Sequence, residues 1–281
     1  MISFVGAGPG AADLITLRGA QRLGRADVVV WASSLVPEAL LTHTRPDAVV
    51  HDSAAMTLED VFRVYADHPD AAIVRLHSGD PALYGAIQEQ MAWCIDNGRE
   101  FEIVPGVSSL GAAAAAAGRE LTVPALAQSV VMTRLAGRTA ASMPARESVA
   151  AFAAHGATMA VFLSGARPRQ LQDELLAEGS GYHADTPAVI VIRASWPDEA
   201  VVRTTVGRLA EDLLTTGART TVLVLVGPAL SGAAGGEAAR SHLYSPAFSH
   251  QFRRRSLRGS TAWRTSGPTA RPGRAARKGA R

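Results

Sequence analysis

The sequence predicts an α/β protein built from two domains. Strand-like apolar runs alternate with helix-like segments along residues 2–230, and this alternation is typical of α/β folds with largely parallel sheets. The first apolar run meets the glycine-rich turn "GAGPG" and then a helix, as in the opening unit of such a fold. A chain of 281 residues is long enough for about two domains of ordinary size. We expect an N-terminal α/β domain at residues 1–118, a second at 119–230 and a tail at 231–281.

The first half of the chain reads as five strands alternating with helices. The strands are the apolar runs at residues 2–7, 27–32, 48–53, 71–80 and 100–106. Helices are expected at residues 12–26, 36–43, 57–68, 81–98 and 107–118. Asp13 is a plausible N-cap for the first helix and Thr57 for the third, and Pro37 suits an early position of the second. The regular alternation predicts a mostly parallel sheet.

The second half departs from this regular rhythm. Residues 119–127 resemble a linker. A run at 128–135 follows, with helices expected at 147–156, 167–179 and 208–217 and strands at 158–165, 187–196, 199–207 and 220–230. Since two of these strands follow one another without a helix between them, we expect some antiparallel pairs.

Composition indicates a globular protein and gives no sign of a disulfide or of a zinc site. Hydrophobic residues make up 47% and charged residues 19%, and no apolar stretch reaches the roughly 18–20 residues of a membrane span. The N-terminus lacks the pattern of a secretory signal, so we expect a cytoplasmic protein with no membrane segment. Cys94 is the only cysteine and is interpreted as a small filler on a helix. No cysteine/histidine cluster has zinc spacing, so no metal site is expected.

Charge is distributed unevenly along the chain. From Ser231 onward there are eleven Lys/Arg residues and one acidic residue, Glu237, whereas residues 1–230 carry seventeen Lys/Arg and twenty-four Asp/Glu. The tail is rich in Gly, Ser, Pro and Arg, a composition that cannot bury enough apolar surface to fold alone. We interpret it as a disordered appendage and expect its deletion to leave catalysis intact. A nucleic-acid or membrane-surface arm is the less favoured alternative.

The glycine turn admits a dinucleotide site as one interpretation. Gly6, Gly8, Gly10 and Ala11 match the G-x-G-x-x-G/A pattern in the correct position. A dinucleotide fold also needs an acid at the end of the second strand to bind the ribose, whereas Asp27 lies at its start. Pro9 removes a backbone N–H that a pyrophosphate would use. The details argue against a nicotinamide cofactor.

The loops at the carboxyl ends of the strands favour a different ligand. These loops are "GAGPG", "ASSLVP", "HSGDPALYGA" and "PGVSSL", and Asp80 is the single carboxylate at their centre. Ligands of parallel sheets gather at this edge, and small residues allow close approach to the backbone. No nucleophile–base pair is present, so we expect a ligand that is held by main chain and is already activated.

The motifs "VGAGPG", "RLHSGDPALYGA", "VPGVSS" and "RASWPDE", in this order and spacing, resemble those of the tetrapyrrole (corrin/porphyrin) methyltransferase family. The resemblance covers about residues 2–230. It implies two α/β domains with a ligand trough between them, S-adenosyl-L-methionine at the domain interface and a homodimer. The stretches "SLVP", "MTLE", "GRELTVP" and "AAHGATMAVFLS" are most similar to members that methylate precorrin-4 at C11 in cobalamin biosynthesis.

The resemblance also implies cofactor contacts at particular residues. Carried over position by position, these are Pro9, Ser78, Gly79, Asp80, Leu83, Ser108, Ser109, Leu163, Ala194 and Thr221. Two departures occur. Ala11-Ala12 stands where relatives commonly have Asp-Pro, so no acid/base role can be carried over there, and Ser33 replaces a glycine of the "AGSLVP" stretch.

The chemistry asks mainly for positioning, because the sulfonium methyl group is already activated. The general base is not identified. His77 is interpreted as a polar strand-end residue, Asp80 as a cofactor-positioning group, and Tyr84 as a residue that packs or lines the trough one turn into a helix. The substrate carries many carboxylates, for which arginine is the usual partner. The candidate substrate-binding arginines are Arg75, Arg119, Arg134 and Arg193.

Several alternatives stay open on the sequence. Within the family, the substrate could be cobalt-precorrin-4, or precorrin-2 or uroporphyrinogen III. Diphthine-synthase-like and ribosomal-RNA methyltransferases share the fold, although a nucleic-acid substrate is not favoured. From other classes, a nicotinamide-dependent oxidoreductase and a non-catalytic binding module with a basic arm are the weakest candidates.

Overall fold

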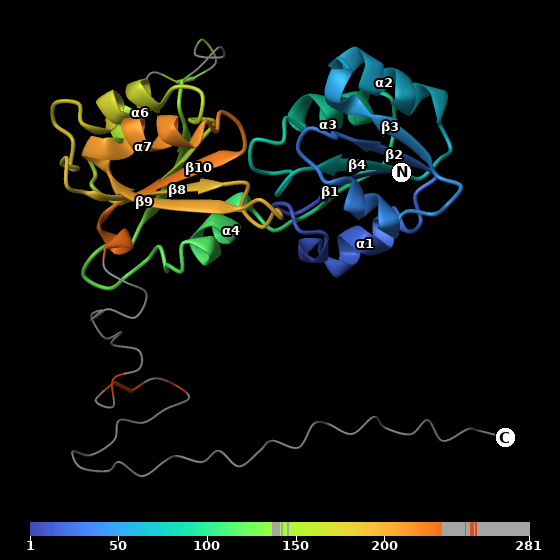
Figure 1. Ribbon diagram of the computed structural model, residues 1–281. Helices are drawn as coiled ribbons and strands as arrows, with labels where there is room; N and C mark the ends of the chain where they lie inside the picture. Colours follow the sequence, from blue (N-terminus) through green and yellow to red (C-terminus); the bar gives the residue numbers. More distant parts are fainter. Residues whose placement is uncertain are drawn as a thin grey trace. The chain divides into compact units, whose positions relative to one another are not determined.

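The computed structural model describes residues 1–136, 141, 143–144, 146–231, 245, 248–249 and 251 (Figure 1). Residues Met1–Ala238 belong to one compact unit, and its described part contains two five-stranded sheets. The two-domain α/β prediction is therefore confirmed at the level of fold. The predicted tail, residues 231–281, lies almost entirely outside the described residues.

The first sheet is entirely parallel, as predicted. Its strand order is β3-β2-β4-β1-β5, and each neighbouring pair runs parallel. The strands are β1 (Ile2–Gly6), β2 (Val28–Trp31), β3 (Val49–Asp52), β4 (Ile73–His77) and β5 (Phe101–Val104). In the register of the sheet, Gly6 stands beside His77 and Val5 beside Val104. The loops that follow β1, β4 and β5 consequently leave the same edge next to one another.

Helices cover both faces of this sheet. Figure 1 shows α1 (Leu17–Leu23) on one face and α2 (Leu58–Asp67) with α3 (Gln88–Asp96) on the other. Alternate strand residues point to opposite faces, so Val5 packs in the cluster with Leu23 of α1, while Phe4 packs with Tyr65 of α2. Short 3-10 turns at Ala12–Leu14, Glu38–His43 and Ser53–Ala55 complete the layer connections.

The helix starts differ from the predictions at three places. Helix α1 begins after Thr16, whose hydroxyl accepts the backbone N–H of Gly19 at 3.1 Å, so Asp13 as the N-cap was wrong. The segment after Pro37 forms a 3-10 helix instead of an α-helix. The helix expected from residue 81 begins only at Gln88, because Tyr84 and Ala86 adopt left-handed φ angles of 58° and 49°. By contrast, the Thr57 cap of α2 is confirmed as a capping box with Asp60.

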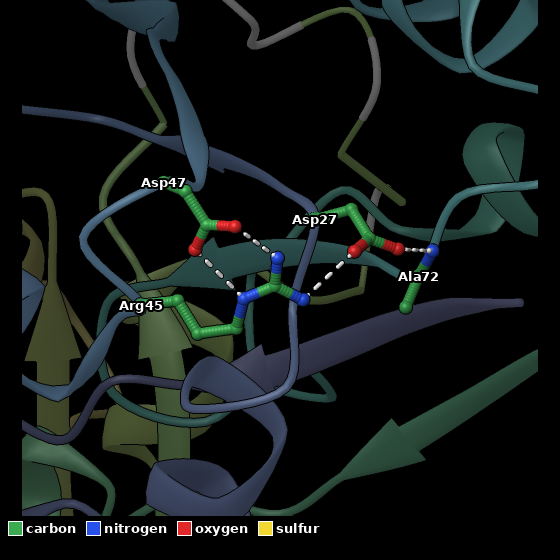
Figure 2. A network of polar contacts seen from close by, with 4 residues as sticks. All are labelled: Asp27, Arg45, Asp47 and Ala72. Carbon is green, nitrogen blue, oxygen red and sulfur yellow. Dashed lines mark hydrogen bonds and ion pairs between the residues drawn. The ribbon is translucent and has the colours of Figure 1, made fainter.

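Asp27 has a structural role at the edge of the sheet away from the loops just described. Figure 2 shows Arg45 between Asp47 and Asp27, with Arg45 Nη1 donating to Asp27 Oδ1 at 3.0 Å. The other oxygen of Asp27 accepts the backbone N–H of Ala72 at 2.8 Å. This carboxylate therefore joins the starts of β2 and β4, and it is not available to bind a ribose at their carboxyl ends.

The second sheet is mixed, as predicted from the adjoining strands. Its order is β6-β7-β10-β8-β9. The pair β6–β7 is parallel and the other three pairs are antiparallel. The strands are β6 (Val130–Arg134), β7 (Thr158–Phe162), β8 (Pro187–Ile192), β9 (Ala200–Thr205) and β10 (Val222–Val226).

Helices also cover both faces of the second sheet. One core contains α5 (Val149–Ala153), α6 (Pro168–Leu175) and α7 (Leu209–Thr216). The opposite face is covered by α4 (Ser109–Ala116), whose Ala113 packs with Ala160, Val189 and Leu225 of the strands (Figure 1). Short 3-10 turns lie at Val206–Arg208 and Pro228–Leu230. Helix α4 precedes the predicted boundary at residue 118 and nevertheless packs on the second sheet, while the boundary itself stays a prediction.

Candidate functional site

Four glycines bring the loops after β1, β4 and β5 into direct backbone contact. A Cβ atom added to Gly106 would lie 2.1 Å from the carbonyl oxygen of Gly79, and one added to Gly6 would lie 2.4 Å from Cα of Gly106. Gly8 and Gly79 exchange backbone hydrogen bonds, with N–O distances of 3.2 and 2.7 Å. Only glycine permits this approach, so the small residues predicted for these loops are required by the backbone packing itself.

Asp80 ties two of these loops together. Its Oδ1 accepts the backbone N–H of Ala82 at 2.8 Å, and its Oδ2 accepts that of Gly106 at 2.9 Å. Beyond Gly106, Ser108 caps α4 by accepting the N–H of Leu110 at 3.2 Å. The carboxylate is therefore used to fix backbone geometry.

A cavity of about 500 Å³ opens beside these loops. Its lining comes from the carboxyl-edge loops of the first sheet and from strands and loops of the second, including Phe162, Val191 and Leu223. All ten positions carried over from the family pattern line it. They are Pro9, Ser78, Gly79, Asp80, Leu83, Ser108, Ser109, Leu163, Ala194 and Thr221. Residues from widely separated parts of the sequence thus converge on one space of the size that small-molecule sites have.

Strained backbone conformations gather around the cavity. Leu163, Thr221 and Tyr84 line it and have φ angles of 54°, 54° and 58°. Arg193 and Ser195, on either side of the lining residue Ala194, have φ angles of 49° and 66°. Such conformations are costly for residues with a side chain and cluster at ligand sites. Their concentration here supports this cavity as the functional site.

His77 lies in the cavity wall in its neutral form. The residue is buried, and this burial, followed by the charge of Arg75, lowers the pKa of His77 to about 3. Its Nε2 atom has no hydrogen-bond partner among the described residues. A neutral imidazole with so low a pKa is a poor general base, which agrees with its interpretation as a non-catalytic strand-end residue.

The four candidate arginines are divided by the structure. Arg75 lines the cavity, and its Nη1 donates to Ser53 Oγ at 3.0 Å, while burial lowers the pKa of its guanidinium. Arg119 and Arg134 are not among the lining residues. Arg193 does not line the cavity either. Its Nε donates to Asp198 at 2.6 Å, and its guanidinium lies 4.0 Å above the Trp196 ring. Substrate binding by these three stays a prediction.

The sequence reasoning missed several lining residues. Arg219 and Thr220 stand directly before β10 and line the cavity, as do Ala32 and Leu35. The signal for Arg219 was its place two residues before the predicted Thr221 contact. Tyr84 does line the cavity as expected, but from a left-handed turn instead of a helix. Burial raises the pKa of the Tyr84 hydroxyl, and the positive charge of Arg134 partly offsets this increase.

Two further structural observations concern clusters of metal-ligating side chains and the lengths of the helices. Within the part of the chain that the structure describes, no three His, Cys, Asp or Glu side chains are grouped to hold a metal ion. Among the same residues, none of the helices has the length and apolar character needed to cross a bilayer.

The fold and the site place the chain among known methyltransferases. The model of the Tetrapyrrole (Corrin/Porphyrin) Methylases matches residues 1–210, and the chain belongs to this family. A cobalt-precorrin-4 C(11)-methyltransferase of Priestia megaterium is 44% identical over 89% of this chain and 96% of its own length. A precorrin-4 C(11)-methyltransferase of Sinorhizobium sp. is 43% identical over 90% of this chain and 98% of its own length.

Solved structures agree with this assignment. A cobalt precorrin-4 methyltransferase of cobalamin biosynthesis has a TM-score of 0.78 and 44% identity, covering 82% of this chain and 96% of that one. A uroporphyrin-III C-methyl transferase from Thermus thermophilus, complexed with S-adenosyl homocysteine, has a TM-score of 0.67 and 27% identity, covering 82% and 98%. The resemblance stated from the motifs is confirmed, and the oxidoreductase and binding-module alternatives are set aside.

Proposed function

We propose that this protein transfers a methyl group from S-adenosyl-L-methionine to C11 of precorrin-4, giving precorrin-5 in cobalamin biosynthesis. The observation that carries the proposal is the convergence of all ten carried-over positions on one cavity. It is supported by relatives at 44% and 43% identity whose names state C11 methylation of cobalt-precorrin-4 and precorrin-4. The metal-free and cobalt-containing macrocycles are both within the proposed substrate class.

The residues present fit the proposed cofactor. Gly79 lines the cavity without a side chain, and its backbone lies so close to Gly106 that a Cβ atom on Gly106 would be excluded. Ser78 and Ser109 add small polar side chains, and Pro9 and Leu83 add apolar surface. S-adenosyl-L-methionine supplies an activated methyl group. Against it, the chain supplies orientation and exclusion of water, and neither requires an enzymic nucleophile.

Proton removal from the macrocycle is not assigned to His77 or Asp80. The pKa of His77, about 3, leaves it a weak acceptor at neutral pH. Both oxygens of the Asp80 carboxylate already accept backbone N–H groups. These side chains maintain the shape of the cavity, which agrees with a reaction whose driving force resides in the methyl donor.

We propose that Arg75 and Arg219 contact acidic groups of the tetrapyrrole. Both line the cavity, and arginine pairs with carboxylates in bidentate geometry. Arg219 is exposed and Arg75 half-buried, so they offer positive charge at different depths. Following the family resemblance, we also propose a homodimer, which light scattering of the purified chain would test. From the sequence pattern we propose a cytoplasmic location.

The cofactor assignment is tested by titrating S-adenosylhomocysteine into the wild type and Ser109→Trp by calorimetry. Ser109 is the first residue of α4 and lines the cavity, so the indole should fill the cofactor space and abolish binding. Leu17→Trp is the matched control, since Leu17 is the first residue of α1 and is 86% exposed. Equal affinity of Ser109→Trp and wild type would contradict the assignment, as would tighter binding of NADH than of S-adenosylhomocysteine.

The reaction itself is tested with precorrin-4 and a methyl donor labelled with ¹³C. Product NMR should place the label on C11, and mass spectrometry should show the gain of one methyl group. A label at another ring carbon would overturn the proposed regiochemistry while leaving methyl transfer in place. Parallel assays with cobalt-precorrin-4 distinguish the two macrocycles.

A further inference from the structure

Two segments that are far apart in the sequence hold each other beside the cavity. The backbone N–H of Ala11 donates to Ser195 Oγ at 3.0 Å, and the indole Nε1–H of Trp196 donates to the carbonyl oxygen of Pro9 at 3.0 Å. We call this pair of hydrogen bonds the clasp, formed by residues 9–11 and 195–196. It joins the glycine turn after β1 to the turn between β8 and β9.

The glycine turn is shaped to receive the indole. A Cβ atom added to Gly10 would lie 2.3 Å from Trp196 Cδ1 and 2.9 Å from Ser195 Oγ. The ring therefore packs directly on the Gly10 backbone, which no other residue type permits. Pro9 and Gly10 are buried, so the Pro9 carbonyl depends on a protein donor for its hydrogen bond.

The other half of the clasp is held by its own turn. The carboxylate of Glu199 accepts the backbone N–H of Ser195 at 2.6 Å. Arg193 pairs with Asp198 at 2.6 Å and covers the Trp196 ring at 4.0 Å. These contacts fix Ser195 at a φ of 66°, a conformation that needs support from its surroundings. The turn thus holds the Ser195 hydroxyl and the Trp196 indole N–H in position toward residues 9–11.

Each half of the clasp is adjacent to cavity-lining residues. Pro9 lines the cavity itself, and the neighbouring Gly8 exchanges backbone hydrogen bonds with Gly79 in the loop after β4 of the same sheet. On the other side, Ala194 lines the cavity directly before Ser195. The clasp therefore sets the spacing between the wall contributed by the first sheet and the wall contributed by the second.

We propose that Ser195 and Trp196 are positioning residues that hold Pro9 and Ala194 in the arrangement that binds the methyl donor. This inference rests on the proposed function, because it takes S-adenosyl-L-methionine as the ligand of the cavity. Loss of either hydrogen bond lowers the population of the competent arrangement, and the apparent dissociation constant rises in proportion.

The test compares S-adenosylhomocysteine binding by calorimetry in wild type, Ser195→Ala and Trp196→Phe. Each variant should bind about tenfold more weakly, the change that corresponds to losing one ordinary hydrogen bond. The matched controls lie away from the cavity. Ser180 also accepts a backbone N–H, that of Tyr182, at 3.0 Å, and Trp93 stacks on Phe62 at 5.6 Å. Ser180→Ala and Trp93→Phe should bind like wild type.

Ser195→Gly separates positioning from stability. Glycine adopts the left-handed conformation without strain, so this variant should melt at a higher temperature than Ser195→Ala, yet it lacks the same hydroxyl. We expect its affinity to stay as low as that of Ser195→Ala, with a raised KM for the methyl donor and an unchanged KM for the tetrapyrrole. Recovery of affinity together with stability would overturn the inference.

The outcomes for the two proposals are distinguishable. If wild type binds S-adenosylhomocysteine and the clasp variants bind equally well, the clasp inference is wrong and the proposed function stands. If wild type itself does not bind this ligand, the cofactor assignment fails and the inference fails with it. Equal weakening of the clasp variants and both controls would assign the effect to general destabilisation and would also overturn the inference.

Discussion

The carboxylate of Asp80 accepts the backbone N–H of Gly106 at 2.9 Å, across the junction where the loops after β4 and β5 meet. Its second oxygen accepts the N–H of Ala82 within its own loop at 2.8 Å. One side chain thus fixes two of the loops beside the cavity relative to each other. This relationship gives the most direct mutational prediction.

Asp80→Ala should lower the free energy of unfolding by about 1–3 kcal/mol, because two backbone N–H groups lose their charged acceptor. The affinity for S-adenosylhomocysteine should fall at the same time. Asp80→Asn keeps one carbonyl oxygen and should have an intermediate effect. Urea denaturation and calorimetry measure the two quantities. Asp70→Ala, which changes an exposed acid, is the control, and identical behaviour of Asp70→Ala and Asp80→Ala would contradict this role.

Gly106→Ala should be strongly destabilising, since its Cβ atom would stand 2.1 Å from the Gly79 carbonyl oxygen. Relief requires movement of two backbones, and overpacking of this kind costs about 1–3 kcal/mol or more. Gly111→Ala is the control, because no atom lies within 4 Å of the Cβ position and the residue is inside helix α4. We expect Gly111→Ala to raise the melting temperature. A Gly106→Ala protein as stable as wild type would rule out the tight glycine junction.

The buried neutral His77 should make the protein sensitive to acid. Burial lowers its pKa in the folded protein to about 3 from the ordinary 6.5, so between these values the unfolded chain holds one more proton than the folded chain. The free energy of unfolding therefore falls as pH falls through this window, by about 2 kcal/mol from this residue between pH 7 and pH 5. His77→Gln lacks this proton uptake. Denaturation curves of both proteins at these two pH values should show a smaller loss for His77→Gln, and equal losses would contradict a buried neutral imidazole.

Asp27→Asn should leave cofactor affinity unchanged. Asp27 accepts Arg45 and the backbone N–H of Ala72 (Figure 2), and it is not among the cavity-lining residues. The expected loss of stability is about 1 kcal/mol, the size of an ordinary hydrogen-bond contribution. Calorimetric titration with S-adenosylhomocysteine provides the check. Weakened binding with normal stability would mean that this carboxylate reaches a ligand after all.

Local sequence patterns predicted the architecture correctly, but they placed several helix starts wrongly. Alternation of apolar runs and helical spacing identified every strand of the first sheet and its parallel character. The stretch "PALYGA" has helix-compatible residues, yet Tyr84 and Ala86 are left-handed. Tyr84 lines the cavity, so tertiary context overrides local preference here. Thr16 displaced Asp13 as the cap because Ala12–Leu14 forms a separate 3-10 turn first.

Some residues of the candidate site could be predicted from the sequence and others could not. Motif resemblance placed ten residues that the structure brings to one cavity, since backbone-binding loops leave clear small-residue signatures. Arginines leave no such signature. Arg193 stands beside the cavity-lining Ala194 and is engaged by Asp198 and Trp196, whereas Arg219 was overlooked. The bond from Trp196 to Pro9 spans 187 positions, and a single sequence contains no information that pairs such distant residues.

The position of β1 between β4 and β5 in the first sheet has a consequence for synthesis of the chain. Residues Ile2–Gly6 leave the ribosome well before both of their partner strands, Ile73–His77 and Phe101–Val104. Until His77 has emerged, both edges of this apolar strand are unpaired in the nascent polypeptide, and one edge remains unpaired until Val104 has emerged. Unpaired strand edges are prone to aggregation. The glycine turn that follows β1 can therefore take its final shape only after the loops of β4 and β5 have arrived to meet it.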